Sequence, residues 1–384
     1  MCAETMSIDD ALLACMLELA EAIQQIPAPT FGESQRSAFI LQQFQSEGLS
    51  DVSVDELGNV YGRLPGARTA PPLVVTAHLD TVFPQGTRLE IRRENGKIFG
   101  PGIGDNSLGL AGLFGLLWAL RQTSSLGSDL GIDQSKIADL WFVANVCEEG
   151  LGDLRGMRAV VERFGRRVTA YLVLEGMSLG QVYHRALEVA RYRITMRTAG
   201  GHSWVDFGRP SAVHELATLV SRLTMIPLPS HPRTTLNVGM MSGGTSVNTI
   251  AAEATLELDL RSEGTRALKD LVEQVSELAA AAEKPNVKVE LTLIGKRPGG
   301  GLSLQHPLVQ LARRCLERQG IQPNLTIGST DANVPLSQDL PAICVGLTTG
   351  GGAHTQQEFI HTEPCKKGLA QLVCLVEGLL ARTS

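Results

Sequence analysis

Two kinds of hydrophobic pattern alternate along the first half of the chain. Apolar residues at helical spacing predict helices over Ile8–Ile26 and Ser34–Glu47. Short, continuously apolar runs at Leu73–Thr76, 138–146 and 170–174 predict buried strands, and a glycine-rich segment leads into an apolar helix between the first two. Strands that alternate with helices indicate an α/β layer with a mostly parallel sheet.

The pattern changes between about residues 181 and 189. RYRITMRT alternates like a half-exposed antiparallel strand, and a helix, two alternating strands, a helix and a strand follow it. This β-α-β-β-α-β order is the ferredoxin-like arrangement. We therefore expect an inserted ferredoxin-like α+β domain at 187–296, within a catalytic α/β domain formed by 1–186 and 297–384.

Composition narrows the class of protein. The 384 residues are 43% hydrophobic and 19% charged, which is ordinary for a globular protein. A net charge of -6 argues against a nucleic-acid surface, and the sequence contains no apolar run of membrane-spanning length. The start resembles no signal peptide, and the seven cysteines are scattered without a CxxC motif. These features predict a cytoplasmic protein with reduced thiols and neither a nucleic-acid nor a membrane partner.

Side chains that can bind metal ions follow the buried strands or the glycine-rich loop. They are His78 with Asp80, Asp105, Glu148 with Glu149, Glu175 and, late in the chain, His354. Because ligands bind beyond the carboxyl ends of such strands, we expect these side chains to converge. Clustered carboxylates repel one another unless cations neutralise them. Imidazole and carboxylate donors without thiolate suit Zn²⁺, Mn²⁺ or Co²⁺.

Each of these residues also has a purely structural explanation. A histidine at a strand end is commonly a hydrogen-bonded surface residue, Asp105 fits a helix N-cap, and Glu148-Glu149 fits a solvated loop. The GPGIG segment departs from GxGxxG spacing, which disfavours a nicotinamide-dependent oxidoreductase. The joint occurrence of such residues at four strand ends favours a metal site.

Several motifs together resemble a known family. HLDTVF, GIGDNSLG, CEEGLGDLRG, LEG and GGGAHTQQEFI follow the order seen in the zinc-dependent exopeptidases and amidohydrolases. That family includes peptidase T, carboxypeptidase G-type enzymes, aminoacylase and succinyl-diaminopimelate desuccinylase. GGHSW and VNTIAAEATLELDLR match as well, so the resemblance covers nearly the whole chain. It implies that the inserted domain is a lid and dimerisation domain of a homodimer.

The resemblance implies a centre of two divalent metal ions, zinc first, with cobalt or manganese as alternatives. His78 and Glu175 would bind one ion, Glu149 and His354 the other, and Asp105 both. One departure from the family lies beside Asp105: many members have Asp-x-Lys-Gly there, and this chain has DNSLG.

The resemblance also implies catalytic roles. Asp80 would fix the tautomer of His78, and Glu148 would be the general base for a water that bridges the metals. His202 would donate a hydrogen bond to the oxyanion across a dimer interface. The alternative for His202 is a structural role in a strand-to-helix turn.

Four further residues match positions that bind substrate in the family. Asn248 and Arg261 correspond to residues that bind its carboxylate, and Ser329 and Thr330 of GSTDANVP line its pocket. Asn248 also fits a turn, and Arg261 a salt bridge. The other histidines match no motif and are expected to be surface or packing residues: His184, His214, His231, His306 and His361.

The candidate site leaves three functions open. The leading one is a peptidase T-like exopeptidase that hydrolyses a terminal amide bond of di- or tripeptides. GSTDANVP and TTGGGAHT favour this branch, whereas Glu175 is typical of carboxypeptidase and deacylase members, so an N-acyl amino acid deacylase is the alternative. A non-catalytic metal-binding protein would require damage to the ligands or the base, and the sequence shows none.

Overall fold

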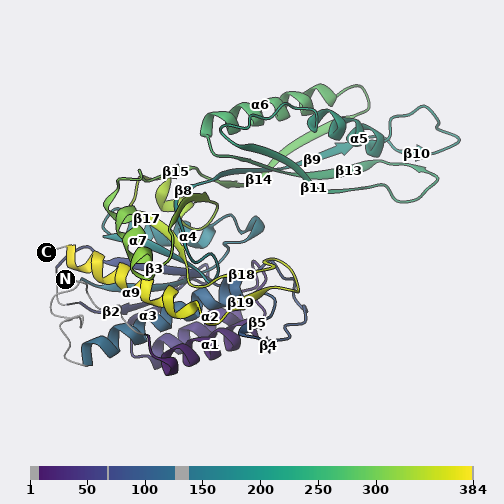
Figure 1. Cartoon of the computed structure of the whole chain (residues 1–384). Coiled ribbons are helices and arrows are strands. Elements are labelled where there is room, and N and C mark those ends of the chain that lie inside the picture. The colour runs from purple at the N-terminus through teal and green to yellow at the C-terminus, as the bar shows by residue number, and fades with distance from the viewer. Residues whose placement is uncertain (1–7, 67–68, 126–137, 383–384) are drawn as a thin grey trace. The chain divides into compact units, whose positions relative to one another are not determined.

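The computed structural model describes residues 8–66, 69–125 and 138–382. The chain divides into two compact units (Figure 1). Unit 1 combines Met1–Ala186 with Gly300–Ser384, and unit 2 is Leu187–Gly299.

The central sheet of unit 1 has the strand order β1-β2-β6-β3-β7-β17-β8-β15, with β16 beside β8. The four inner strands run parallel: β6 (Leu140–Asn145), β3 (Leu73–His78), β7 (Ala170–Glu175) and β17 (Ala342–Gly346). The outer strands are β1 (Ser50–Val54), β2 (Val60–Leu64), β8 (Gln181–Ala186), β15 (Gly300–Gly301) and β16 (Asn324–Gly328). Of these, β1, β2, β8 and β15 join the sheet antiparallel, and β16 pairs with β8 in parallel. The predicted mixed α/β architecture is confirmed.

Helices cover both faces of this sheet (Figure 1). One core contains α1 (Asp10–Gln24), α2 (Ser34–Ser46), α3 (Leu108–Ser125), α7 (Pro307–Arg318) and α9 (Cys365–Arg382). The other contains α4 (Arg155–Phe164) and α8 (Asn333–Leu336). Side chains alternate between faces along a strand. His78, Asn145 and Glu175 therefore end three neighbouring strands on the α4 side of the sheet.

One helical segment of the described residues, Ile103–Gln122, is long and apolar enough to cross a membrane. The protein buries 89% of this segment's apolar window. It packs between the sheet and α1, as a core helix does.

A small sheet was absent from the predicted elements. It has the order β18-β19-β5-β4 and joins β4 (Arg92–Glu94) and β5 (Lys97–Phe99) to β18 (Gly350–Gly351) and β19 (Phe359–His361). Its pairing brings the segment before Asp105 next to the segment that carries His354.

Unit 2 is an antiparallel sheet with two helices. The strand order is β11 (Thr234–Gly243), β13 (Glu253–Ser262), β9 (Glu188–Arg197) and β14 (Lys288–Arg297). Apolar side chains of one sheet face pack against α5 (Ala212–Leu223) and α6 (Thr265–Ala282). The chain order and the strand order both agree with the ferredoxin-like prediction. A short pair, β10 (Gly201–His202) with β12 (Thr249–Ile250), carries one of the predicted site residues.

The ends of the insertion meet in unit 1. Ala186 of β8 and Gly300 of β15 are register partners. We predict that replacing Leu187–Gly299 by an Asn-Gly turn leaves a unit 1 that folds, because such a turn can join paired antiparallel strands. Circular dichroism should show a cooperative thermal transition for the shortened protein. A chain that aggregates or melts without cooperativity would show that unit 1 needs the insertion to fold.

Candidate dinuclear metal centre

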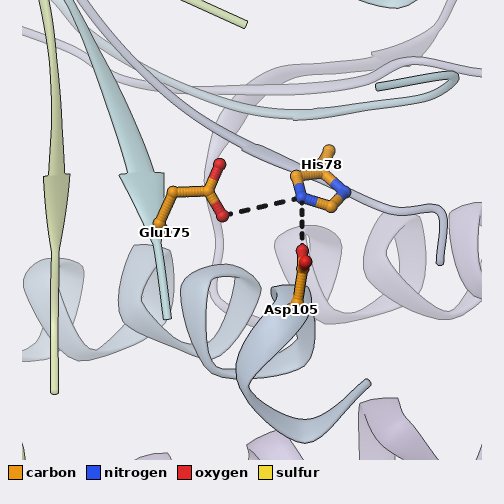
Figure 2. Close-up of side chains that lie close together, drawn as sticks. All are labelled: His78, Asp105 and Glu175. Atoms are coloured by element: carbon orange, nitrogen blue, oxygen red, sulfur yellow. Dashed lines mark ion pairs between the residues drawn. The ribbon is translucent and has the colours of Figure 1, made fainter. Parts of the chain in front are cut away.

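His78 lies at the centre of a group of acidic side chains. It ends β3, and its side chain is 1% exposed. Its Nε2 is 3.1 Å from Oδ1 of Asp105 and 3.7 Å from Oε2 of Glu175, the last residue of β7. Figure 2 shows the imidazole facing both carboxylates. Asp105 comes from the loop before α3, so three elements supply this group.

Asp105 also faces a second group. Its other oxygen, Oδ2, is 3.0 Å from Nε2 of His354, and that nitrogen is 3.3 Å from Oε1 of Glu149. Ligand atoms of His78, Asp105 and Glu175 lie within 4.8 Å of one another, as do those of Asp105, Glu149 and His354. The structure thus brings all five predicted ligands together, with Asp105 shared by the two groups.

Asp80 is a buried carboxylate that contacts three chain segments. Its Oδ1 is 3.5 Å from Nδ1 of His78, and the two oxygens accept hydrogen bonds from the backbone N–H groups of Glu148 and Glu149, both at 2.8 Å. The hydroxyl of Thr30 donates a further bond at 2.9 Å. Burial would raise the pKa of Asp80, but the contacts with His78 and the two backbone N–H groups hold it below its usual value. The hydrogen bond of His78 goes to the backbone of the same residue, because its Nδ1 is 3.0 Å from the carbonyl oxygen of Asp80. Asp80 therefore holds the Glu148-Glu149 backbone through its carboxylate and His78 chiefly through its backbone carbonyl.

Glu148 lies close to the same side chains. It is 5% exposed, and its carboxylate forms a group with ligand atoms of His78 and Glu149 within 4.8 Å. By position alone, Glu148 could bind a metal ion or act on a molecule bound beside one.

The loop after Asp105 is fixed by Asn106. The Asn106 amide donates to the carbonyl of Leu174 at 2.8 Å and accepts from the N–H of Gly176 at 2.9 Å. A Cβ atom on Gly109 would lie 1.9 Å from Oδ1 of Asn106, so only glycine leaves room for this side chain. The DNSLG segment, which departs from the family pattern, thus attaches the Asp105 loop to the end of β7.

The charges of the group are poorly compensated within the protein. Burial and the charge of Asp105 raise the pKa of Glu149 to about 8, and burial raises the pKa of Glu175 to about 7. Hydrogen bonds to Asp105 and Glu149 raise the pKa of His354 to about 10. Burial opposes ionisation of Asp105, but the bonds with His354 and His78 hold its pKa below the usual range. Carboxylates as close as these are stable as anions together only when a metal cation or a protonated side chain compensates their charge.

Two divalent cations fit this donor set. Each group offers one imidazole and two carboxylates, and the shared Asp105 presents one oxygen to each imidazole. Zn²⁺, Co²⁺ and Mn²⁺ accept such nitrogen and oxygen donors. The raised pKa values of Glu149 and Glu175 are the expected consequence of ligands that cations would neutralise.

Comparison with known proteins identifies the family. The sequence profile of peptidase family M20/M25/M40 matches residues 74–378. The chain belongs to this family. The resemblance inferred from the motifs is therefore confirmed, as is the prediction of a metal-dependent hydrolase.

Relatives of this M20 chain span nearly its full length. A peptidase T of Aeromonas hydrophila is 26% identical over 88% of this chain and 89% of its own. A succinyl-diaminopimelate desuccinylase of Corynebacterium glutamicum is 24% identical over 90% and 92%. The crystal structure of a tripeptidase from Staphylococcus aureus superposes with a TM-score of 0.79 at 21% identity, covering 96% of this chain and 99% of that one. The similarity to the tripeptidase structure concerns the fold alone.

The predicted substrate-binding residues lie in both units of the M20 chain. Ser329 and Thr330 follow β16 in unit 1, and the Thr330 hydroxyl accepts the N–H of Ala332 at the start of α8. Asn248 and Arg261 belong to unit 2, where Arg261 forms a salt bridge with Asp259. Their roles stay predictions.

His202 also belongs to unit 2. It is exposed on β10, where its Nδ1 accepts the N–H of Trp204 at 3.2 Å. Trp204 and Phe207 of the same loop are 85% and 90% exposed. The proposed oxyanion role of His202 stays a prediction.

The remaining histidines lie outside the candidate metal groups of the described residues. His184 is buried and pairs with the carbonyl of Leu302, and His306 caps α7. His361 ends β19 and contacts Thr349. His214 lies in α5, and His231 lies in a loop.

Sequence reasoning missed several buried polar residues of the site. Glu358 accepts three backbone N–H groups of the Asp105 loop, and Arg36 donates to the carbonyl of Leu79 at 2.7 Å. Asn145 donates to Oδ2 of the fully buried Asp331 at 2.7 Å. The available signals were the spacing of Glu358 four residues after His354 and the position of Asn145 at the end of a buried strand.

The contacts of Asp80 predict unequal effects of two substitutions. His78→Ala should remove a ligand and reduce the metal content by one ion per chain. Asp80→Asn should keep both ions but weaken binding about 10–100-fold, because an amide nitrogen cannot accept one of the two backbone N–H groups. Metal analysis after dialysis and competition with a chelator measure both effects. Equal metal loss in the two variants would show that Asp80 does more than orient its neighbours.

Proposed function

We propose that the protein is a dinuclear-metal exopeptidase that hydrolyses a terminal amide bond of di- or tripeptides. The observation that carries this proposal is the pair Glu148-Glu149, whose two backbone N–H groups bind one carboxylate, Asp80. Glu149 lies in the group with His354, and Glu148 has a carboxylate oxygen within 4.8 Å of ligand atoms of His78 and Glu149. The similarity to peptidase T supports a peptide substrate.

Glu148 would act as the general base in this reaction. It takes a proton from water as the water oxygen bonds to the amide carbon, and it passes that proton to the nitrogen as the C–N bond breaks. The products are a carboxylate and an amine. Two divalent ions, zinc first, would lower the pKa of the attacking water and polarise the carbonyl. His78, Glu175, Glu149, His354 and Asp105 would hold these ions.

The function also involves unit 2 in our proposal. We assign His202 as the hydrogen-bond donor to the oxyanion, and we propose a homodimer through unit 2 in which this residue serves the other subunit's centre. The exposure of His202 and of the aromatic side chains Trp204 and Phe207 beside it supports a role at an interface. A cytoplasmic location agrees with the absence of a disulfide framework in the sequence and stays part of the proposal.

Substrate recognition is assigned to two pairs of residues. Asn248 and Arg261 would bind the free carboxylate of the substrate, and Ser329 and Thr330 would line its pocket. Arg261 is already paired with Asp259, which also binds Arg191, so the three side chains carry a net charge of one positive unit. That surplus charge can attract a carboxylate.

A second candidate is an N-acyl amino acid deacylase. Glu175 occupies a ligand position at which glutamate is typical of carboxypeptidase and deacylase members. A desuccinylase is also among the relatives that match over most of the chain. Both candidates use the same base and the same ligands and differ in the group that carries the scissile carbonyl.

Adjacent glutamates provide the test of the mechanism. Glu148→Gln should reduce kcat about 100–10,000-fold while metal content stays near two ions per chain, because a general base is lost and no ligand is removed. The matched variant Glu149→Gln should lose metal as well as turnover. If Glu148→Gln loses an ion, or keeps the wild-type rate, the assignment of the base is wrong.

A substrate panel separates the two candidate functions. We expect turnover of tripeptides or dipeptides to exceed that of N-acetyl and N-succinyl amino acids at least tenfold in kcat/KM. Release of free amino acids, followed by mass spectrometry, also identifies the end attacked. Preference for the N-acyl compounds would establish the deacylase instead.

A further inference from the structure

Glu358 is a fully buried carboxylate beside the metal centre that is not among its ligands. It lies four residues after His354 and has no exposed surface. Its Oε1 accepts the backbone N–H groups of Gly104 at 2.7 Å and Asp105 at 2.8 Å, and its Oε2 accepts that of Gly102 at 3.1 Å. The side chain therefore binds the loop that carries the shared ligand.

The shape of this loop explains the three contacts. Gly102 has a left-handed backbone with φ of 78°, and the N–H groups of Gly102, Gly104 and Asp105 point to the same carboxylate, whereas that of Ile103 donates to the carbonyl of Gly100. Successive N–H groups in such a conformation form a concave site for an anion. Glu358 supplies the acceptor oxygens from within the chain.

The contacts also join two segments that lie far apart in the sequence. The N–H of Gly100 donates to the backbone carbonyl of Glu358 at 2.9 Å, next to the pairing of β5 with β19. The first segment carries Asp105, and the second carries His354 four residues before Glu358. Nε2 of His354 and Oδ2 of Asp105 are 3.0 Å apart. Glu358 thus binds the segment that carries Asp105 and belongs to the segment that carries His354.

A second buried carboxylate at this place has an electrostatic cost. It adds a negative charge near Asp105 in a region of low polarity, which is unfavourable without compensation. An apolar side chain would fill the same space without this cost but would leave three N–H groups without an acceptor. The contacts therefore favour a role that requires an acceptor of fixed geometry.

We propose that Glu358 is a positioning residue for the metal centre: it holds the backbone of Asp105 so that one carboxylate oxygen faces His78 and the other faces His354. This inference rests on the proposed two-metal function. It assigns to Glu358 no contact with metal or substrate. Its effect on the reaction passes through the orientation of Asp105.

Two substitutions and one control test the proposal. Glu358→Gln keeps the size of the side chain and one acceptor oxygen, and Glu358→Ala removes both oxygens. The control is Asp139→Asn, because Asp139 accepts the N–H of Gly66 at 2.9 Å and precedes β6, at the opposite end of that strand from Asn145. The measurements are the melting temperature of the metal-free full-length protein, its affinity for Zn²⁺ in competition with a chelator, and the visible absorption of the Co²⁺-loaded protein.

We expect Zn²⁺ affinity to fall in the order wild type, Glu358→Gln, Glu358→Ala, by about tenfold and then about 100-fold, the range found when groups that orient ligands are removed. The Co²⁺ spectrum of Glu358→Gln should change, because the geometry at the shared ligand changes. The melting temperature of metal-free Glu358→Gln should fall no further than that of Asp139→Asn, which should keep wild-type affinity and spectrum.

Three results would overturn the proposal. Wild-type affinity and spectrum in both Glu358 variants would show that Asp105 is positioned without Glu358. A loss of affinity matched by a larger loss of metal-free stability than in the control would show a structural role only. If the wild-type protein binds neither Zn²⁺ nor Co²⁺, the proposed function fails together with this inference. The first two results would overturn only the role of Glu358 and would leave the proposed function intact.

Discussion

The fold of unit 1 must hold several negative charges at one edge of a buried sheet. Carboxylates that lose contact with water are unstable as anions unless donors or cations replace the water. The protein compensates its acids in different ways. Asp80 is compensated by two backbone N–H groups, and Asp105 by two imidazoles. Glu149 and Glu175 have less compensation and raised pKa values, so they are the positions where cations gain most.

This division separates acids that hold the chain around the site from acids that are candidate metal ligands. The structural acids accept N–H groups of irregular segments: Asp80 those of Glu148 and Glu149, and Glu358 those around the distorted helical turn η1 (Ile103–Ser107). A ligand held in this way loses little conformational entropy on binding, which is the advantage of preorganisation. Asp80 shows the principle best, since its carboxylate accepts the N–H groups of two consecutive glutamates and its backbone carbonyl pairs with His78.

Much of this arrangement was predictable from sequence because it depends on residue type and strand position. Parallel strands place their carboxyl ends at one edge, so polar residues after β3 and β7 had to meet there. The alternating strands and the two helices of unit 2 likewise predicted its ferredoxin-like order, because that order can be read from the residue types along the chain. The family resemblance supplied what periodicity could not, namely the choice of five candidate ligands, which the structure brings together in two groups that share Asp105.

The contacts that sequence did not reveal are those made with the backbone. A backbone N–H group is present at nearly every residue, so the sequence names the acceptor Glu358 but not the donors that it meets. Asn106 is a further example, because its two partners are a backbone carbonyl within β7 and the backbone N–H group just after that strand. The small sheet of β4, β5, β18 and β19 was missed because its strands are too short for periodicity to show. A motif therefore identifies candidate ligands more readily than buried acids such as Glu358, because the partners of such acids are backbone groups that the sequence does not mark.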